Sequence, residues 1–73
     1  MRTLTLEQFR ATVEAGGVLG VSLKAQGGAF YVDVETRRGE AVLVTAREKK
    51  PRAFADPRRA LLLLRDIGIL EAH

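Results

Sequence analysis

The last third of the chain carries the clearest pattern of apolar positions. Asp56 is a favoured N-cap residue, and Pro57 suits a first helical position because it needs no backbone N–H there. Gly68 readily adopts the left-handed conformation that closes a helix, and Ile69 follows where an apolar contact often completes that ending. Residues 56–69 are therefore predicted to form the core helix. Four apolar residues then share one of its faces: Ala60, Leu63, Leu64 and Ile67.

A second helix is predicted near the N-terminus, over residues 6–15. Thr5 and Gln8 have the spacing of a capping box, and Leu4 and Phe9 have that of a hydrophobic staple. The apolar stripe comprises Leu6, Phe9 and Val13, and the pair Gly16-Gly17 ends it.

From Val18 onward the apolar period changes to two, which predicts half-buried strands. A two-residue turn at Gln26-Gly27 would place the apolar residues of the first two strands on one face. The expected pairs are Leu23 with Phe30, Val21 with Val32, and Leu19 with Val34.

The second hairpin has two possible registers. A three-residue loop, Arg37-Arg38-Gly39, places Thr36 opposite Glu40 and buries Val42, Val44 and Ala46. A two-residue loop shifts the register by one residue and buries Leu43 instead. We favour the first, which leaves Tyr31 and Leu43 on the outer face of the sheet.

The fold expected from this order is a single α+β domain spanning residues 1–73. Its elements run α-β-β-β-α, as a three-stranded antiparallel meander with both helices on one face. Residues 48–55, which we call the arm, are expected to be an exposed connection, because Pro51 cannot donate to a strand ladder. Phe54 is expected to return to the core.

Composition excludes several classes of site. With no cysteine and one histidine, the chain has no disulfide and no zinc or iron site built from Cys and His, and we predict no cofactor. The N-terminus lacks an apolar signal-peptide region, and no run approaches the ~18 apolar residues of a membrane span. A cytoplasmic location without membrane contact is expected. A domain of 73 residues has little core, which favours a homodimer.

Positive charge is concentrated in the second half of the chain. Residues 37–59 hold eight basic and three acidic residues, a net +5, whereas the remainder holds four basic and six acidic residues, a net −2. Lys and Arg beside a helix N-terminus favour phosphate binding. The candidate nucleic-acid-binding residues are Arg37, Arg38, Lys49, Lys50, Arg52, Arg58 and Arg59. A solvated loop that maintains solubility is the alternative interpretation.

Three stretches resemble small plasmid-borne partition-associated proteins, the ParC-like family. They are Leu4-Thr5-x-x-Gln8-Phe9-Arg10 with Glu14-Ala15-Gly16-Gly17-Val18, the strand start Gly28-Ala29-Phe30, and Pro51-Arg52-x-Phe54-x-x-Pro57-x-x-Ala60-Leu61-x-Leu63-Leu64-Arg65-Asp66-Ile67-Gly68-Ile69. The resemblance covers nearly the whole chain. It implies a role in plasmid partition or maintenance and supplies no catalytic motif.

The predicted element order is also similar to that of double-stranded-RNA-binding domains. In that family a basic cluster opens the second helix and binds phosphates, and Arg58 and Arg59 occupy the corresponding place here. The family's lysine-rich and alanine-rich signature is absent, so the likeness is one of topology, which is weak evidence for function.

Two other groups of residues have side chains that could form a site. Asp33 and Glu35 lie two residues apart on the outer strand face, where pairing with Lys24 or with a neighbouring subunit is favoured over acid–base catalysis. Tyr31, Leu43 and Leu62 form the candidate partner or dimer surface. His73 at the terminus is not expected to bind a metal.

The leading hypothesis is a small non-enzymatic accessory module that contacts DNA, in preference to RNA, or a DNA-bound partner through a basic rim. The alternative is a protein-interaction module, either homodimer or adaptor, with no affinity for nucleic acid.

Overall fold

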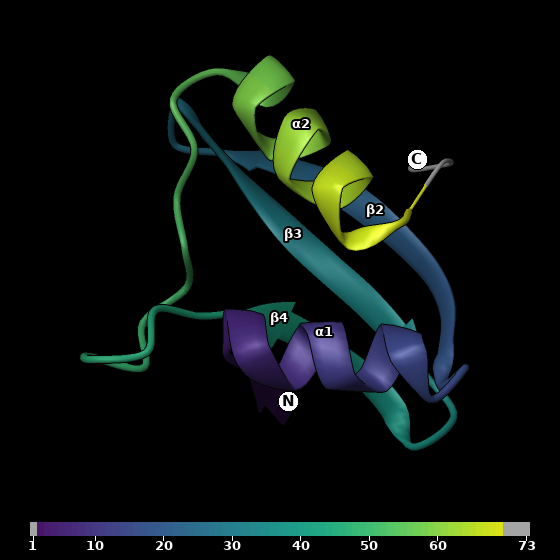
Figure 1. Ribbon diagram of the computed structural model, residues 1–73. Helices are drawn as coiled ribbons and strands as arrows, with labels where there is room; N and C mark the ends of the chain where they lie inside the picture. Colours follow the sequence, from purple (N-terminus) through teal and green to yellow (C-terminus); the bar gives the residue numbers. More distant parts are fainter. Residues whose placement is uncertain (1, 70–73) are drawn as a thin grey trace.

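The computed structural model describes residues 2–69 and shows two helices packed on one face of a four-stranded sheet (Figure 1). The α+β two-layer architecture predicted from the sequence is confirmed. The elements are β1 (Arg2–Leu4), α1 (Leu6–Glu14), β2 (Val18–Gln26), β3 (Ala29–Thr36), β4 (Gly39–Leu43) and α2 (Pro57–Ile67).

The sheet has the strand order β1-β4-β3-β2. Strands β2, β3 and β4 form the expected antiparallel meander, and β1 adds a fourth strand that runs parallel to β4. The sequence gives no signal for β1, since it has three residues and its partner lies far along the chain. Among residues 2–69, no strand pairs with the outer side of β2, which is the longer edge of the sheet.

Both helices begin and end where local sequence predicts. The backbone N–H of Gln8 donates to Thr5 Oγ1 (3.3 Å) and the N–H of Thr5 donates to Gln8 Oε1 (2.9 Å), which completes the capping box. In α2, Asp56 Oδ1 accepts the N–H of Arg58 at 2.9 Å. Gly68 has φ +106°, and the N–H of Ile69 donates to the carbonyl of Leu64 at 2.8 Å.

The predicted register of the first hairpin is wrong by two residues. The turn is Gly27-Gly28, both with positive φ, rather than Gln26-Gly27, because a turn of this kind favours glycine at both central positions. The observed pairs are Val21 with Val34 and Leu23 with Val32. A shift of two residues keeps the same side chains on the core face.

Leu19 is the exception to that pattern. An irregularity between Val18 and Gly20 interrupts the register, and Leu19 is 59% exposed rather than buried opposite Val34. Val18 packs against the core in its place.

The second hairpin has the shorter of the two loops considered, so the favoured register is wrong. Thr36 pairs with Gly39, and the Thr36 hydroxyl donates to the Gly39 carbonyl (2.7 Å) and accepts the N–H of Arg38 (3.1 Å). The one-residue shift places Leu43 in the core, with 0% exposure, and Ala46 is exposed, although Val42 and Val44 are buried as predicted. Leu43 is therefore not on an outer surface.

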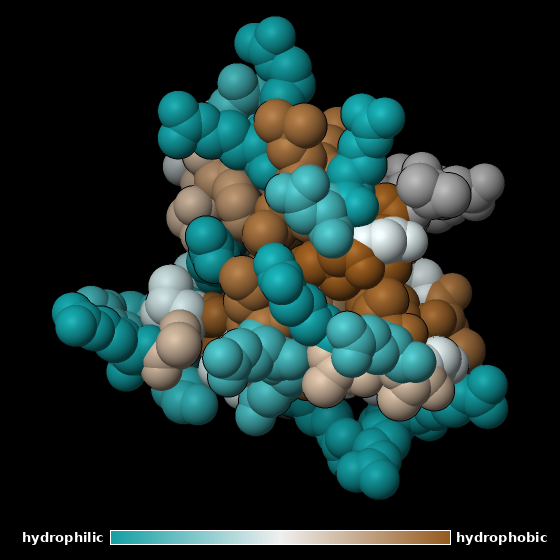
Figure 2. Space-filling view, in the orientation of Figure 1, coloured by the Kyte–Doolittle hydropathy of each residue, from teal (hydrophilic) through white to brown (hydrophobic). Residues whose placement is uncertain are grey.

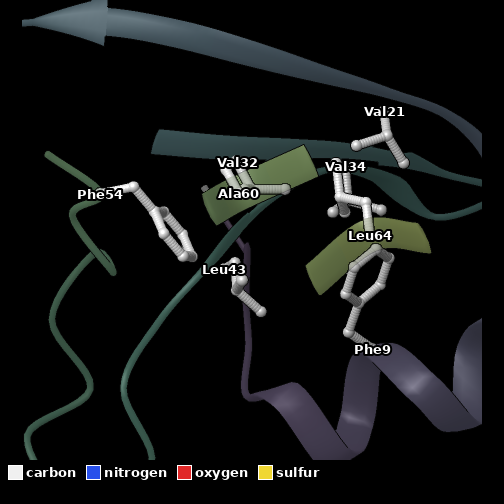
Figure 3. Close-up of a cluster of buried hydrophobic side chains, with 8 residues drawn as sticks. All are labelled: Phe9, Val21, Val32, Val34, Leu43, Phe54, Ala60 and Leu64. Atoms are coloured by element: carbon white, nitrogen blue, oxygen red, sulfur yellow. The ribbon is translucent and has the colours of Figure 1, made fainter. Parts of the chain in front are cut away.

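The core lies between the sheet and the two helices (Figure 3). Phe9 of α1 and Leu64 of α2 point toward each other, and Phe54 points toward Leu43. The remaining members of this cluster are Val21, Val32, Val34 and Ala60. Both helices therefore contribute to one continuous apolar cluster.

The arm continues the sheet where β4 ends. Phe54 pairs with Phe30 through two backbone hydrogen bonds of 2.8 and 2.9 Å, on the side of β3 that β4 occupies further along. Phe54 is 9% exposed, which confirms that it returns to the core. The chain between β4 and this pair turns back on itself at residues 45–50, where the N–H of Thr45 donates to the Lys50 carbonyl.

Candidate interaction surfaces

The basic residues predicted to bind nucleic acid lie in three separate places. Arg37 and Arg38 form the turn after β3, and Lys49 and Lys50 lie in the turn at 45–50. The other three, Arg52, Arg58 and Arg59, lie around the start of α2. Figure 1 shows these segments at three different corners of the molecule.

The length of β3 separates the first place from the third. Phe30, which pairs with the arm, and Arg37 are seven residues apart along an extended strand, about 23 Å at the usual rise per residue. The described residues therefore do not gather the seven basic side chains into one rim.

Two of these side chains also lie beside carboxylates. Lys50 Nζ is 3.5 Å from Glu48 Oε2, and Arg58 Nε is 3.5 Å from Asp56 Oδ1. Exposed pairs of this kind contribute little stability. The Asp56 carboxylate already accepts an N–H at the first turn of α2, which is where a bound phosphate would be expected.

Arg52 and Arg59 line a groove between the arm and α2, which we call the α2 groove. Its volume is about 840 Å³. The guanidinium of Arg52 lies over the Phe54 ring, with 5.5 Å between Cζ and the ring centroid. The complete lining is Arg52, Ala53, Phe54, Ala55, Asp56, Arg59, Leu62, Leu63 and Asp66.

The α2 groove combines apolar side chains with charged side chains whose formal charges balance. Two arginines and two aspartates line it, so their formal charges cancel. Leu62 is 58% exposed, and its neighbour Leu61, which does not line the groove, is 44% exposed. Figure 2 shows apolar side chains on the visible surface of α2. A neutral groove with an exposed leucine is suited to a protein segment that carries both apolar and charged side chains.

The predicted partner surface is divided by the fold. Leu62 is exposed, as expected from its position on the helix. Tyr31 is half-buried on the outer face of the sheet, where it pairs with Lys24. Leu43 is in the core, so only Leu62 of the three lies in the α2 groove.

Sequence reasoning missed most of the groove's other residues. Ala53 and Ala55 line it because the Phe54 backbone pairs with Phe30, which holds the arm beside α2. Asp66 lies four residues after Leu62 and therefore on the same side of the helix, a spacing that could have been recognised from the sequence.

The two acidic residues of β3 differ in their partners. Asp33 Oδ2 is 3.7 Å from Lys24 Nζ, one of the two pairings expected for it. Glu35 lies opposite Glu40 on β4, and within residues 2–69 no basic side chain is within ion-pair distance of it.

The described part of the chain holds neither a metal-binding cluster nor a membrane-spanning helix. No group of three or more His, Cys, Asp or Glu side chains among residues 2–69 could hold a metal ion. No helix of that region is long and apolar enough to cross a membrane. His73 lies outside the described residues.

Comparison with known proteins does not assign the chain to a family. No family model, curated protein or solved structure matches it.

Proposed function

We propose that this chain is a non-enzymatic protein-interaction module that binds a partner protein in the α2 groove. The partner segment presents at least one apolar side chain to Leu62 and Leu63, flanked by charged residues that pair with Arg59 and Asp66. A plasmid-partition setting, implied by the family resemblance, stays a prediction.

The observation that carries this proposal is the exposure of Leu62 in a groove lined by both apolar and charged side chains. A helix in a two-layer domain needs apolar residues on the side that faces the sheet and polar residues on the other. On α2 the core side is occupied by Ala60 and Leu64, yet Leu62 is 58% exposed. Covering it with a partner removes apolar surface from water.

Charge distribution favours a protein partner over nucleic acid. Binding to a phosphate backbone requires several cations along one surface. The three basic groups lie apart, and the cations of the α2 groove are matched by Asp56 and Asp66. The Phe54 ring is buried and covered by Arg52, which leaves it unsuited to stacking on a base.

Selection of peptides tests this proposal. A library of random linear peptides displayed on phage is selected on the full chain, and the affinity of the enriched peptides is measured by fluorescence polarisation. We expect enriched peptides to share an apolar anchor and to lose about tenfold or more in affinity to Leu62→Gln, because the substitution places a polar group where the anchor would bind.

Leu61→Gln is the matched control. It changes the adjacent exposed leucine, which does not line the groove, so affinity should be unchanged. Equal losses for both variants, or no enrichment of apolar anchors, would contradict the proposal. Salt-sensitive binding of labelled duplex DNA or RNA that ignores Leu62→Gln would favour the nucleic-acid hypothesis instead.

A further inference from the structure

We propose that two copies of this chain associate through the free edge of β2, antiparallel and centred on Ser22, to form one continuous sheet of eight strands. This inference is independent of the proposed function, because it concerns the opposite side of β3 from the α2 groove.

The unpaired edge of β2 is the longer of the two edges of the sheet. Strand β2 has nine residues, and within residues 2–69 its one neighbouring strand is β3. Half of its backbone N–H and C=O groups therefore point away from the sheet, where they can pair with another strand. The opposite edge, β1, has only three residues. Leu19, exposed at the start of β2, adds apolar surface to the longer edge.

The alternation of side chains along β2 indicates the register in which two copies pair. A two-fold axis perpendicular to the sheet, passing through Ser22, pairs Val21 of one copy with Leu23 of the other. Both residues face the core side of the sheet, as facing positions in an antiparallel pair require. The segment 20–24 used by this register lies beyond the irregularity at Val18/Gly20, so the strand there is regular.

The charges of Lys24 and Glu35 are complementary between the two copies. In this register Lys24 of one copy lies opposite Gly20 of the other, and Gly20 is itself paired with Glu35. A carboxylate oxygen of Glu35 already lies 3.5 Å from the position that a Gly20 Cβ would occupy. The Glu35 side chain thus leans over Gly20 toward the free edge, with no intervening side chain.

This geometry gives Glu35 a cation that its own chain does not supply among residues 2–69. Neighbouring strands lie about 4.8 Å apart, so Lys24 of the second copy and Glu35 are separated by about 10 Å between Cα atoms, a span that the two side chains bridge. Glu35 faces Glu40 within its own sheet, a like-charge pair that an added lysine stabilises. The two-fold axis provides this contact twice.

The same lysine also selects the register. Charged side chains on an edge strand normally oppose pairing with other strands. Here Lys24 is 66% exposed and 3.7 Å from Asp33, and the register centred on Ser22 is the one that sets it across Gly20 from Glu35. In other registers within β2, Lys24 lies opposite a residue that has a side chain rather than opposite Gly20.

Charge reversal tests the proposal on the full chain. Sedimentation equilibrium should show a concentration-dependent dimer, and Lys24→Glu or Glu35→Lys alone should raise the dimer Kd about tenfold or more, because two attractive contacts become repulsive. The double variant with both reversals should restore dimerisation. Circular dichroism verifies that each variant folds, as expected since both positions are exposed.

Cysteine crosslinking tests the register. The chain has no cysteine, so Ser22→Cys provides a single thiol, which faces its symmetry mate within disulfide distance. Gln26→Cys is the matched control, since it lies on the same face of β2 but is far from its mate. A monomer at all concentrations, a dimer indifferent to charge reversal, or equally rapid crosslinking of both cysteines would overturn the proposal.

Discussion

The two helices lie on the same face of the sheet but differ in their outer surfaces. Helix α1 buries Phe9 and exposes mainly polar residues: Glu7, Gln8, Arg10 and Glu14. Helix α2 buries Ala60 and Leu64, yet it also exposes Leu61 and Leu62. The outer side of α1 is thus suited to water, whereas α2 has apolar area beyond what the core requires. This difference is the reason that the proposed partner site is placed on α2.

The largest predicted effect is a loss of folding stability when a buried residue on the sheet-facing side of either helix is truncated. The two helices should lose similar amounts. Phe9→Ala and Leu64→Ala each remove a fully buried side chain, at a cost of about 3–5 and about 2–5 kcal/mol respectively. A domain of this size has a stability of only about 3–5 kcal/mol, so either variant should be largely unfolded at 25 °C. Urea denaturation followed by far-UV circular dichroism measures this.

Unequal losses of stability for Phe9→Ala and Leu64→Ala would show that the two helices contribute differently to the core. If Phe9→Ala were tolerated with a loss below about 1 kcal/mol while Leu64→Ala unfolded the chain, α1 would be peripheral to the fold. The contact between Phe9 and Leu64 in Figure 3 argues against that outcome, because each side chain covers the other.

The helix ends are the features that sequence predicted best, because their determinants lie within a few residues. Thr5 and Gln8 are three residues apart, and Asp56 contacts the N–H of Arg58 two residues later. The same holds for Gly68, whose positive φ closes α2. None of these depends on how the sheet is arranged.

Strand registers were predicted less well, because they depend on choices between nearly equivalent turns. Moving the first turn from 26–27 to 27–28 keeps the alternation intact, so the pattern could not distinguish the two. The second loop differed by one residue, which moved Leu43 from the predicted outer face into the core. Strand β1 pairs with β4, about 39 residues later, a contact that no local pattern reveals.

In the candidate site, too, features set by local sequence were predicted and features set by long-range contacts were not. Leu62 was predicted to be exposed from helical spacing alone, and it is. The basic rim was inferred from residues close in sequence, but the length of β3 lies between Arg37 and the pair of Phe54 with Phe30 that precedes α2. The α2 groove itself depends on the pairing of Phe54 with Phe30, which is a long-range contact.

A smaller loss of stability is expected when the N-cap residue of either helix is replaced, which compares how the two helices begin. Thr5→Ala and Asp56→Ala each remove a cap and should cost about 1 kcal/mol, measured by urea denaturation. Asp56→Asn keeps an acceptor for the Arg58 N–H but removes the negative charge, so it should cost less than Asp56→Ala. A loss for Asp56→Asn as large as for Asp56→Ala would show that charge, rather than the hydrogen bond, stabilises the start of α2.

The smallest change in the free energy of unfolding is expected for substitutions on the outer side of α2. Its size tests whether that side contributes to folding or is available to a partner. Leu62→Gln should change the free energy of unfolding by no more than about 0.5 kcal/mol, because the side chain is mostly in water already. Leu61→Gln should behave alike. A loss above about 1.5 kcal/mol for Leu62→Gln would place Leu62 in the core in energetic terms, and the exposed leucine would then no longer argue for a partner. Unchanged stability together with lost peptide binding would separate the two roles of α2, since its inner side would hold the fold while its outer side recognised another protein.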